Sequence, residues 1–149
     1  MAVNLAPAEE LLPIQGVRVG SAAAEIKYGG RLDLAIFEFV EGTQVGGVFT
    51  QSHFAAAPVV LARARQLDAR AWLINSGNAN AATGDLGEQD AAETCAETAR
   101  YLQMEAAQVQ PFSTGVIGER LPVERMRAGI ANVTNPYLKR VGWTPPRRS

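Results

Sequence analysis

The stretch Ser113-Thr114-Gly115-Val116-Ile117-Gly118-Glu119 lies between an apolar run, residues 109–112, and the pair Leu121-Pro122. We expect a strand to end here and a helix to begin beyond it, with hydroxyl groups and a flexible glycine in the turn between them. Backbone N–H groups and a threonine hydroxyl in such a turn can bind an anion or a developing oxyanion, so Thr114 and Gly115 are candidate catalytic residues. The alternative is structural: Thr114 caps the helix and Gly115 permits the turn.

A second polar stretch follows another apolar run, residues 71–74, and reads Asn75-Ser76-Gly77-Asn78-Ala79-Asn80-Ala81-Ala82-Thr83-Gly84. Loops that follow buried strands in α/β proteins often contact ligands. The candidate substrate-contacting residues of this asparagine loop are Asn75, Ser76, Gly77, Asn78 and Asn80. An equally weighted alternative is an Asx-turn network, in which the side-chain amides bind their own backbone.

The periodicity of the remaining residues predicts an α/β fold with mixed β-sheet layers flanked by helices. Strands are expected over 17–27, 32–40, 45–50, 71–74 and 109–112, with the first two paired around Gly29-Gly30, and helices over 58–67, 87–104 and from 121 to about 130. Residues 131–136 are expected to break the last helix. The chain then divides into a single domain, residues 1–130 with a loose arm at 1–13, and a divergent, poorly ordered tail, residues 131–149.

Composition narrows the class of protein. The chain has 149 residues, 47% of them hydrophobic, and 14 Lys and Arg against 15 Asp and Glu. This near-neutral charge argues against nucleic acid or an anionic membrane as a partner, and no apolar run is long enough to span a bilayer. One cysteine, Cys95, and one histidine, His53, provide neither a disulfide framework nor a set of metal ligands, so we expect a cytoplasmic protein without a bound metal.

Neither of these two residues is a strong catalytic candidate. His53 follows a predicted strand but has no Ser, Cys or carboxylate at a recognisable spacing, which favours a surface histidine. Cys95 lies on the apolar stripe of the helix predicted over 87–104, which favours a small core residue.

Four blocks, in this order, resemble the bifunctional ornithine acetyltransferase / glutamate N-acetyltransferase family of arginine biosynthesis. They are Gly47-Val48-Phe49-Thr50, Ala57-Pro58-Val59, the asparagine loop from Asn75 to Ala81 with Thr83-Gly84, and Ser113 to Gly118 with Leu121-Pro122. The resemblance covers roughly residues 11–130. It implies that the chain is the N-terminal, α-chain-like part of one incomplete ornithine acetyltransferase-like domain.

This resemblance also implies a chemistry. Family members transfer an acetyl group from N-acetylornithine to glutamate, some also use acetyl-CoA as a donor substrate, and no cofactor is expected. A precursor cuts itself before an internal threonine, which becomes the N-terminal nucleophile of a second chain. Thr114 and Gly115 correspond to the oxyanion-hole pair of the family.

One part of the family pattern is missing. Residues 131–149 contain neither the Lys-Gly run nor the Ala-Thr-Met-Leu segment at which the family cleaves. We therefore expect no nucleophile within this chain, a second chain that supplies it, an oligomeric assembly, and little activity of the chain alone. The alternative function is a non-catalytic, small-metabolite-binding or regulatory domain that pairs with a full-length relative.

Overall fold

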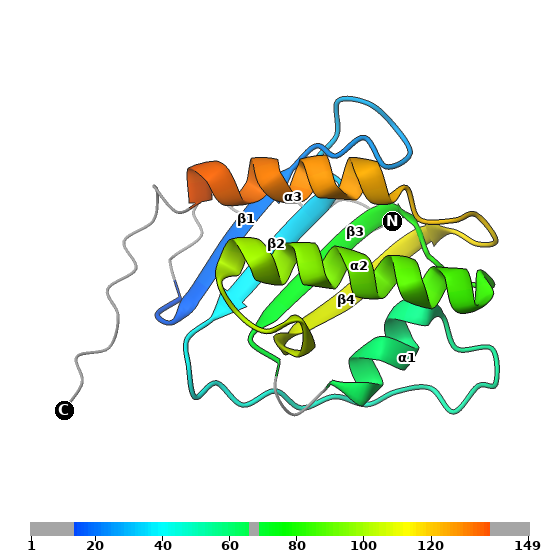
Figure 1. Cartoon of the computed structure of the whole chain (residues 1–149), viewed down its shortest axis with the longest axis horizontal. Coiled ribbons are helices and arrows are strands. Elements are labelled where there is room, and N and C mark those ends of the chain that lie inside the picture. Colours follow the sequence, from blue (N-terminus) through cyan, green and yellow to red (C-terminus); the bar gives the residue numbers. More distant parts are fainter. Residues whose placement is uncertain (1–13, 66–68, 138–149) are drawn as a thin grey trace, which may run out of the picture.

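A computed structural model describes residues 14–65 and 69–137 (Figure 1). Its elements in chain order are β1 (Val17–Ala22), β2 (Leu34–Phe39), α1 (Ala57–Ala64), β3 (Ala71–Asn78), α2 (Gly84–Leu102), the short 3-10 helix η1 (Ala106–Gln108), β4 (Val109–Val116) and α3 (Val123–Tyr137). The four strands form one sheet in the order β1-β2-β3-β4. Because β1, β2 and β3 pair antiparallel whereas β3 and β4 pair parallel, the predicted mixed α/β fold is confirmed.

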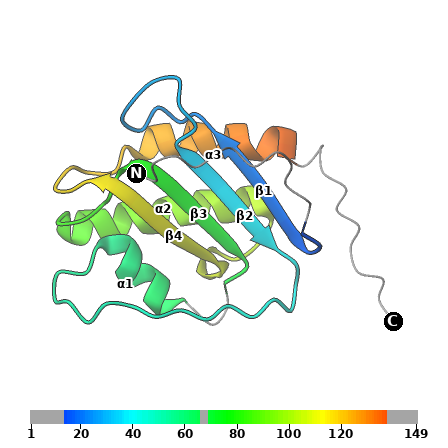
Figure 2. The same cartoon turned by 180° about the vertical axis from the view of Figure 1, so that it is seen from behind.

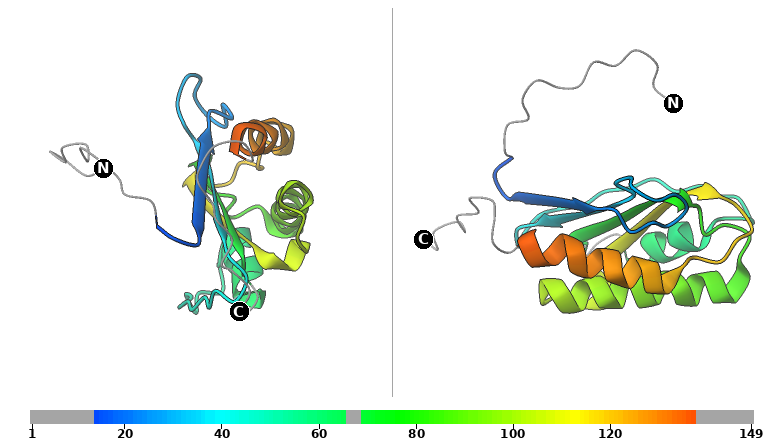
Figure 3. Two further views of the ribbon diagram at one scale, coloured as in Figure 1. Left: turned by 90° about the vertical axis from the view of Figure 1, so that its left-hand side faces the viewer. Right: turned by 90° about the horizontal axis from the view of Figure 1, so that it is seen from above.

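Helices α2 and α3 lie side by side on one face of the sheet (Figure 3). Alternate strand residues point to that face, as the period of two in a strand requires. The buried core consists chiefly of Leu34, Ile36, Leu73 and Val109 from the sheet with Cys95, Ala99, Met126 and Ile130 from the helices. The strand β3, helix α2 and strand β4 form a βαβ unit, and this unit sets the positions of both candidate loops.

Aromatic residues occupy the opposite face of the sheet. Trp72 contacts Phe37, Phe39 and Phe112, with ring centroids 6.0, 4.7 and 5.7 Å away. Residues 45–49 lie against one part of this face and form a cleft of about 360 Å³ with Trp72 and Phe112. Within the part of the chain that the structure describes, α2 and α3 leave this aromatic face uncovered (Figure 3).

The strand predicted over 45–50 is wrong. This segment is irregular and lies against the aromatic face instead of joining the sheet, and Val48 is fully exposed. Gly46 and Gly47 lower the strand propensity of the segment, since glycine loses the most backbone entropy on becoming extended.

The first predicted hairpin is confirmed, but its first strand ends at Ala22 and not at residue 27. The reason is Asp33, whose two carboxylate oxygens accept hydrogen bonds from the backbone N–H groups of Ala24 (2.6 Å) and Ile26 (2.7 Å). These N–H groups therefore bind a side chain in the loop rather than β2.

The predicted break after Ile130 is also wrong, because α3 continues to Tyr137. Val133 and Thr134 extend the buried stripe of the helix, and the hydroxyl of Thr134 donates to the Ile130 carbonyl at 2.8 Å. Burial thus outweighs the polar composition of this segment. The helix predicted over 58–67 is α1, which ends at Ala64 and not at residue 67. The predicted arm at 1–13 and the part of the predicted 131–149 tail from residue 138 onward lie outside the described residues.

Candidate functional site

The structure brings the two polar stretches together. Strands β3 and β4 are parallel neighbours, so their carboxyl ends meet at one edge of the sheet (Figure 2). Ser76 pairs with Thr114 and Gly77 with Gly115, and both strands run further into the polar stretches than the sequence predicts, to Asn78 and Val116. The asparagine loop and the Thr114–Gly115 turn therefore form one candidate site.

Gly115 lies where two backbones approach closely. Its φ is +136°, and a Cβ added there would lie 2.2 Å from the carbonyl carbon of Gly77 and 2.5 Å from the amide nitrogen of Asn78. The ladder is irregular at the same place, because Asn78 pairs with both Thr114 and Val116. Only glycine fits this bulged arrangement, which is a structural reason for Gly115 in addition to the predicted access for an acyl oxygen.

Thr114 is exposed at the end of β4. The helix that follows it, α3, begins only at Val123, so the alternative in which Thr114 caps a helix is wrong. An exposed hydroxyl beside the bulged backbone at Gly115 is compatible with an oxyanion hole, and that role stays a prediction.

Ser113, which precedes this threonine, is joined to the asparagine loop. Its hydroxyl donates to Oδ1 of Asn75 at 2.6 Å, and Nδ2 of Asn75 donates to the carbonyl of Asn78 at 2.8 Å. Asn75 is 2% exposed. Sequence reasoning missed this pair; the only available signal was that both residues directly follow an apolar strand segment, and strand pairing cannot be read from that alone.

The side-chain amides of Asn78 and Asn80 also point inward, where they bind backbone groups. Nδ2 of Asn78 donates to the carbonyls of Glu119 (3.1 Å) and Arg120 (3.0 Å), and its Oδ1 accepts from the N–H of Asn80 at 2.7 Å. Nδ2 of Asn80 donates to the carbonyl of Gly87 at 2.8 Å. These contacts extend the Asx-network interpretation, since the amides bind the backbone of neighbouring segments as well as their own loop.

Among the five candidate residues of the loop, Ser76 is exposed and Gly77 is half-buried, whereas Asn75, Asn78 and Asn80 are buried. A ligand at the surface of this loop would meet Ser76 and Gly77 first. Contact between the loop and a substrate stays a prediction for all five.

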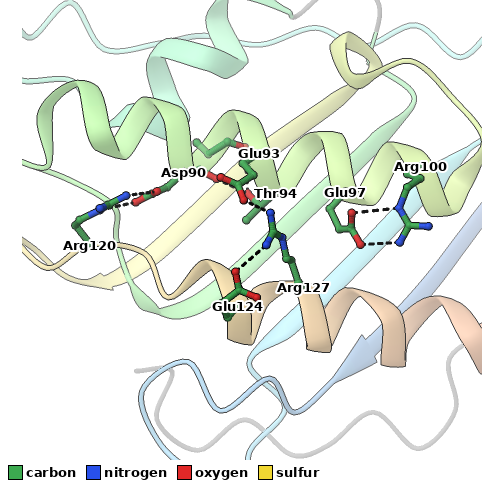
Figure 4. Close-up of polar contacts among 9 residues, drawn as sticks. Asp90, Glu93, Thr94, Glu97, Arg100, Arg120, Glu124 and Arg127 are labelled. Atoms are coloured by element: carbon green, nitrogen blue, oxygen red, sulfur yellow. Dashed lines mark hydrogen bonds and ion pairs between the residues drawn. The ribbon is translucent and has the colours of Figure 1, made fainter.

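Charged residues surround the turn. Nζ of Lys27 lies 3.4 Å from both carboxylate oxygens of Glu119, which links the β1–β2 loop to the segment after β4. Arg120 forms a bidentate ion pair with Asp90 of α2, at 2.6 and 3.1 Å (Figure 4). The hydrogen bonds that its guanidinium donates to this carboxylate raise the pKa of Arg120 above its ordinary value.

His53 is exposed and lines a cleft of about 370 Å³ next to the asparagine loop, together with Phe54, Thr83, Glu88 and Ile117. Cys95 is fully buried, and burial raises the pKa of its thiol to about 12. A thiol in this state is a core group and not a nucleophile, as the helical pattern predicts.

The described part of the chain offers neither a metal site nor a membrane-spanning helix. Residues 14–65 and 69–137 contain no group of three or more His, Cys, Asp or Glu side chains that could hold a metal ion. None of the helices in the described ranges is long and apolar enough to cross a membrane.

Two crystal structures share this fold. One is the ornithine acetyltransferase of Mycobacterium tuberculosis complexed with ornithine, at 38% identity and a TM-score of 0.75, covering 80% of this chain and 66% of that one. The other is the arginine biosynthesis bifunctional protein argJ of Bacillus halodurans, at 30% identity and a TM-score of 0.69, covering 77% of this chain and 61% of that one. The fold is thus that of ornithine acetyltransferases.

The chain belongs to the ArgJ family, whose family model matches residues 18–142. Two curated relatives are the arginine biosynthesis bifunctional proteins ArgJ of Methylococcus capsulatus and Pseudomonas fluorescens. Each is 46% identical, over 140 and 131 residues, which is 93% and 87% of this chain but only 34% and 32% of the relative. The chain spans about a third of their length, and the family match continues past residue 130, where the resemblance was expected to stop.

Proposed function

We propose that this chain forms one part of an acetyltransferase of arginine biosynthesis, which moves the acetyl group of N-acetylornithine to glutamate and accepts acetyl-CoA as a further donor, without a cofactor. The observation that carries the proposal is the meeting of Thr114–Gly115 with the asparagine loop at the carboxyl ends of two parallel strands, in a chain of the ArgJ family. The names of the relatives and the ornithine complex of the Mycobacterium tuberculosis enzyme support this substrate class.

In this mechanism the reacting hydroxyl belongs to a threonine outside the chain, exposed by self-cleavage of a precursor. The hydroxyl attacks the acetyl carbonyl, its proton passes to the departing amine of ornithine, and an acetyl-threonine ester remains. The amine of glutamate then attacks this ester and regenerates the hydroxyl. In both steps the carbonyl oxygen gains negative charge, which the Thr114 hydroxyl and the Gly115 N–H stabilise.

The aromatic face of the sheet supports a second chain as partner. Trp72 and the three phenylalanines around it are apolar, Phe112 is 39% exposed, and Nε1 of Trp72 is buried without a hydrogen-bond partner in the described structure. Together with the fully exposed Val48 of the adjoining segment, Phe112 leaves apolar surface in water, and such surface often marks a contact with a partner. We propose that the part of the protein that carries the nucleophile covers this face, that the assembly is oligomeric, and that it works in the cytoplasm.

The test is complementation. The chain is co-expressed with the portion of the Methylococcus relative that lies beyond the matched region, and acetyl transfer from N-acetylornithine to glutamate is measured. We expect transfer by the pair and none by either part alone. No transfer by a co-purified, folded pair would overturn the proposal, and tight binding of a metabolite by the chain alone would instead favour the non-catalytic alternative.

A further inference from the structure

We propose that Arg120 is a positioning residue for the Thr114–Gly115 turn, held through its backbone by Asn78 and through its side chain by Asp90. The inference rests on the proposed function. In this role Arg120, which lies outside the candidate loops, fixes the backbone whose N–H groups would bind the oxyanion.

The first contact is between the side chain of Asn78 and the backbone of Arg120. Asn78 is buried, and its Nδ2 donates to the carbonyl of Arg120 and to that of the preceding residue. Because Oδ1 of Asn78 accepts the N–H of Asn80 at 2.7 Å, the amide cannot turn over without losing all three bonds. Asn78 is therefore a rigid anchor for the segment that follows β4.

Two backbone bonds reinforce this anchor. The N–H of Ala79 donates to the carbonyl of Val116 at 2.9 Å, and the N–H of Gly118 donates to the carbonyl of Ala81 at 2.8 Å. Residues 116–120 are consequently fastened along the asparagine loop.

The second contact is the ion pair between the side chains of Arg120 and Asp90. The carboxylate of Asp90 is 4% exposed and points from α2 toward Arg120, whose guanidinium reaches it from the surface with 59% of its side chain exposed (Figure 4). A buried carboxylate is costly without a partner, and a bidentate guanidinium is the most directional partner that a protein offers. Asp90 therefore fixes the direction as well as the distance of Arg120.

The pairing of β3 with β4 holds this turn only in part, so the contacts of Arg120 add to it. Gly115 and Gly118 both have positive φ, +136° and +83°, and the ladder is irregular beside Gly115. A regular strand would fix the Gly115 N–H through its own hydrogen bonds, whereas a bulged strand end depends on what fastens the next residues. Releasing Arg120 should let the turn shift, and a displacement of about 1 Å can slow catalysis by up to about a hundredfold.

Arg127 provides a matched control. It is an arginine of similar exposure that binds Glu93 of α2 and Glu124 of α3, so it joins two helices and not the segment after β4 (Figure 4). Like Arg120→Ala, the variant Arg127→Ala deletes an arginine side chain that makes two contacts with carboxylate oxygens. A difference that is confined to the segment after β4 therefore reports the place of the contact and not the loss of an arginine, whereas a change throughout the chain reports the unpaired carboxylate of Asp90.

The first experiment uses the 149-residue chain and measures amide hydrogen exchange. We expect Arg120→Ala to speed exchange at Gly115–Gly118 by about tenfold or more relative to Arg127→Ala. Arg120→Ala should also lower the melting temperature more, because it leaves the buried carboxylate of Asp90 without a partner, so the increase at Gly115–Gly118 must exceed the increase at the amides of β1 and β2. Equal exchange at these residues in the two variants would overturn the inference. Asp90→Asn should reproduce the Arg120→Ala pattern, and combining the two should add little.

The second experiment uses the complemented enzyme. Arg120→Ala should lower kcat by about tenfold to a hundredfold with KM within about threefold, Arg120→Lys should recover part of the loss, and Arg127→Ala should leave both near wild type. An unchanged kcat for Arg120→Ala would overturn the positioning role while the proposed function stands. If the wild-type pair transfers no acetyl group, the proposed function fails, and hydrogen exchange alone decides whether Arg120 fixes the turn.

Discussion

The Ser113 hydroxyl donates a 2.6 Å hydrogen bond to Oδ1 of the buried Asn75, and this contact joins the ends of two parallel strands directly beside Thr114. Ser113→Ala leaves a buried acceptor without its donor, so we expect the free energy of unfolding to fall by about 1–3 kcal/mol. Urea denaturation of the chain measures this. Ser76→Ala, which removes an exposed hydroxyl from the same site, is the control and should change stability by less than about 0.5 kcal/mol. Equal effects of the two substitutions would mean that the bond contributes nothing to stability.

A second prediction concerns Gly115. Its Cβ in a Gly115→Ala variant would collide with the backbone of Gly77 and Asn78, so two strands must separate and we expect a loss of more than about 3 kcal/mol or failure to fold. Gly118→Ala is the control, since its φ is also positive but the space around it is open; the backbone strain alone costs about 1–2 kcal/mol. Circular dichroism with urea titration separates the two. A Gly115→Ala chain as stable as Gly118→Ala would show that the close approach is relaxed in solution.

A third prediction uses the buried thiol of Cys95. Burial raises its pKa from 9.0 to about 12, so the unfolded chain loses this proton at a lower pH than the folded chain does. The unfolded state is then favoured progressively as pH rises, and the contribution of Cys95 to stability should fall between about pH 9 and 12. Comparing the stability of wild type and Cys95→Ala at pH 8 and pH 10.5 isolates this effect from other titrating groups. A constant difference between the two proteins at both pH values would contradict it.

The sequence predicts the βαβ unit well because its signals are local. The apolar run before Asn75, the helical spacing from Ala91 to Leu102 and the apolar run before Ser113 each fit one element. The sequence signals fail where tertiary contacts decide the structure. Burial of Val133 and Thr134 extends α3 through its polar stretch, and residues 45–50 contain Val, Phe and Thr, which favour strands, but pair with no strand of the sheet.

For the candidate site, too, the sequence predicts what local signals decide and misses what tertiary contacts decide. Thr114, Gly115 and the asparagine loop could be selected from composition and resemblance, but the inward direction of the Asn78 and Asn80 amides could not, since it depends on which backbone lies beside them. Arg120 and Asp90 are ordinary charged residues thirty positions apart in the sequence. Only the packing of α2 against the end of β4 makes them a pair.

The last prediction tests Thr114. In the oxyanion role its hydroxyl strengthens its bond to the carbonyl oxygen as charge develops, so it acts on the transition state more than on substrate binding. In the complemented enzyme, Thr114→Ala should lower kcat by about a hundredfold to a thousandfold and leave KM within a few-fold. Since Thr114 is exposed and does not cap α3, the melting temperature should hardly change.

Two variants complete this test. Thr114→Ser keeps the hydroxyl and should recover most of kcat, while Ser21→Ala removes an exposed hydroxyl from β1, at the other edge of the sheet, and should have no effect. If the kcat of Thr114→Ala were close to that of Ser21→Ala, the oxyanion role of Thr114 would be wrong. If Thr114→Ala instead raised KM at constant kcat, the hydroxyl would bind the substrate equally in the ground and transition states, and the stabilising donors would have to be sought among the backbone N–H groups of the turn.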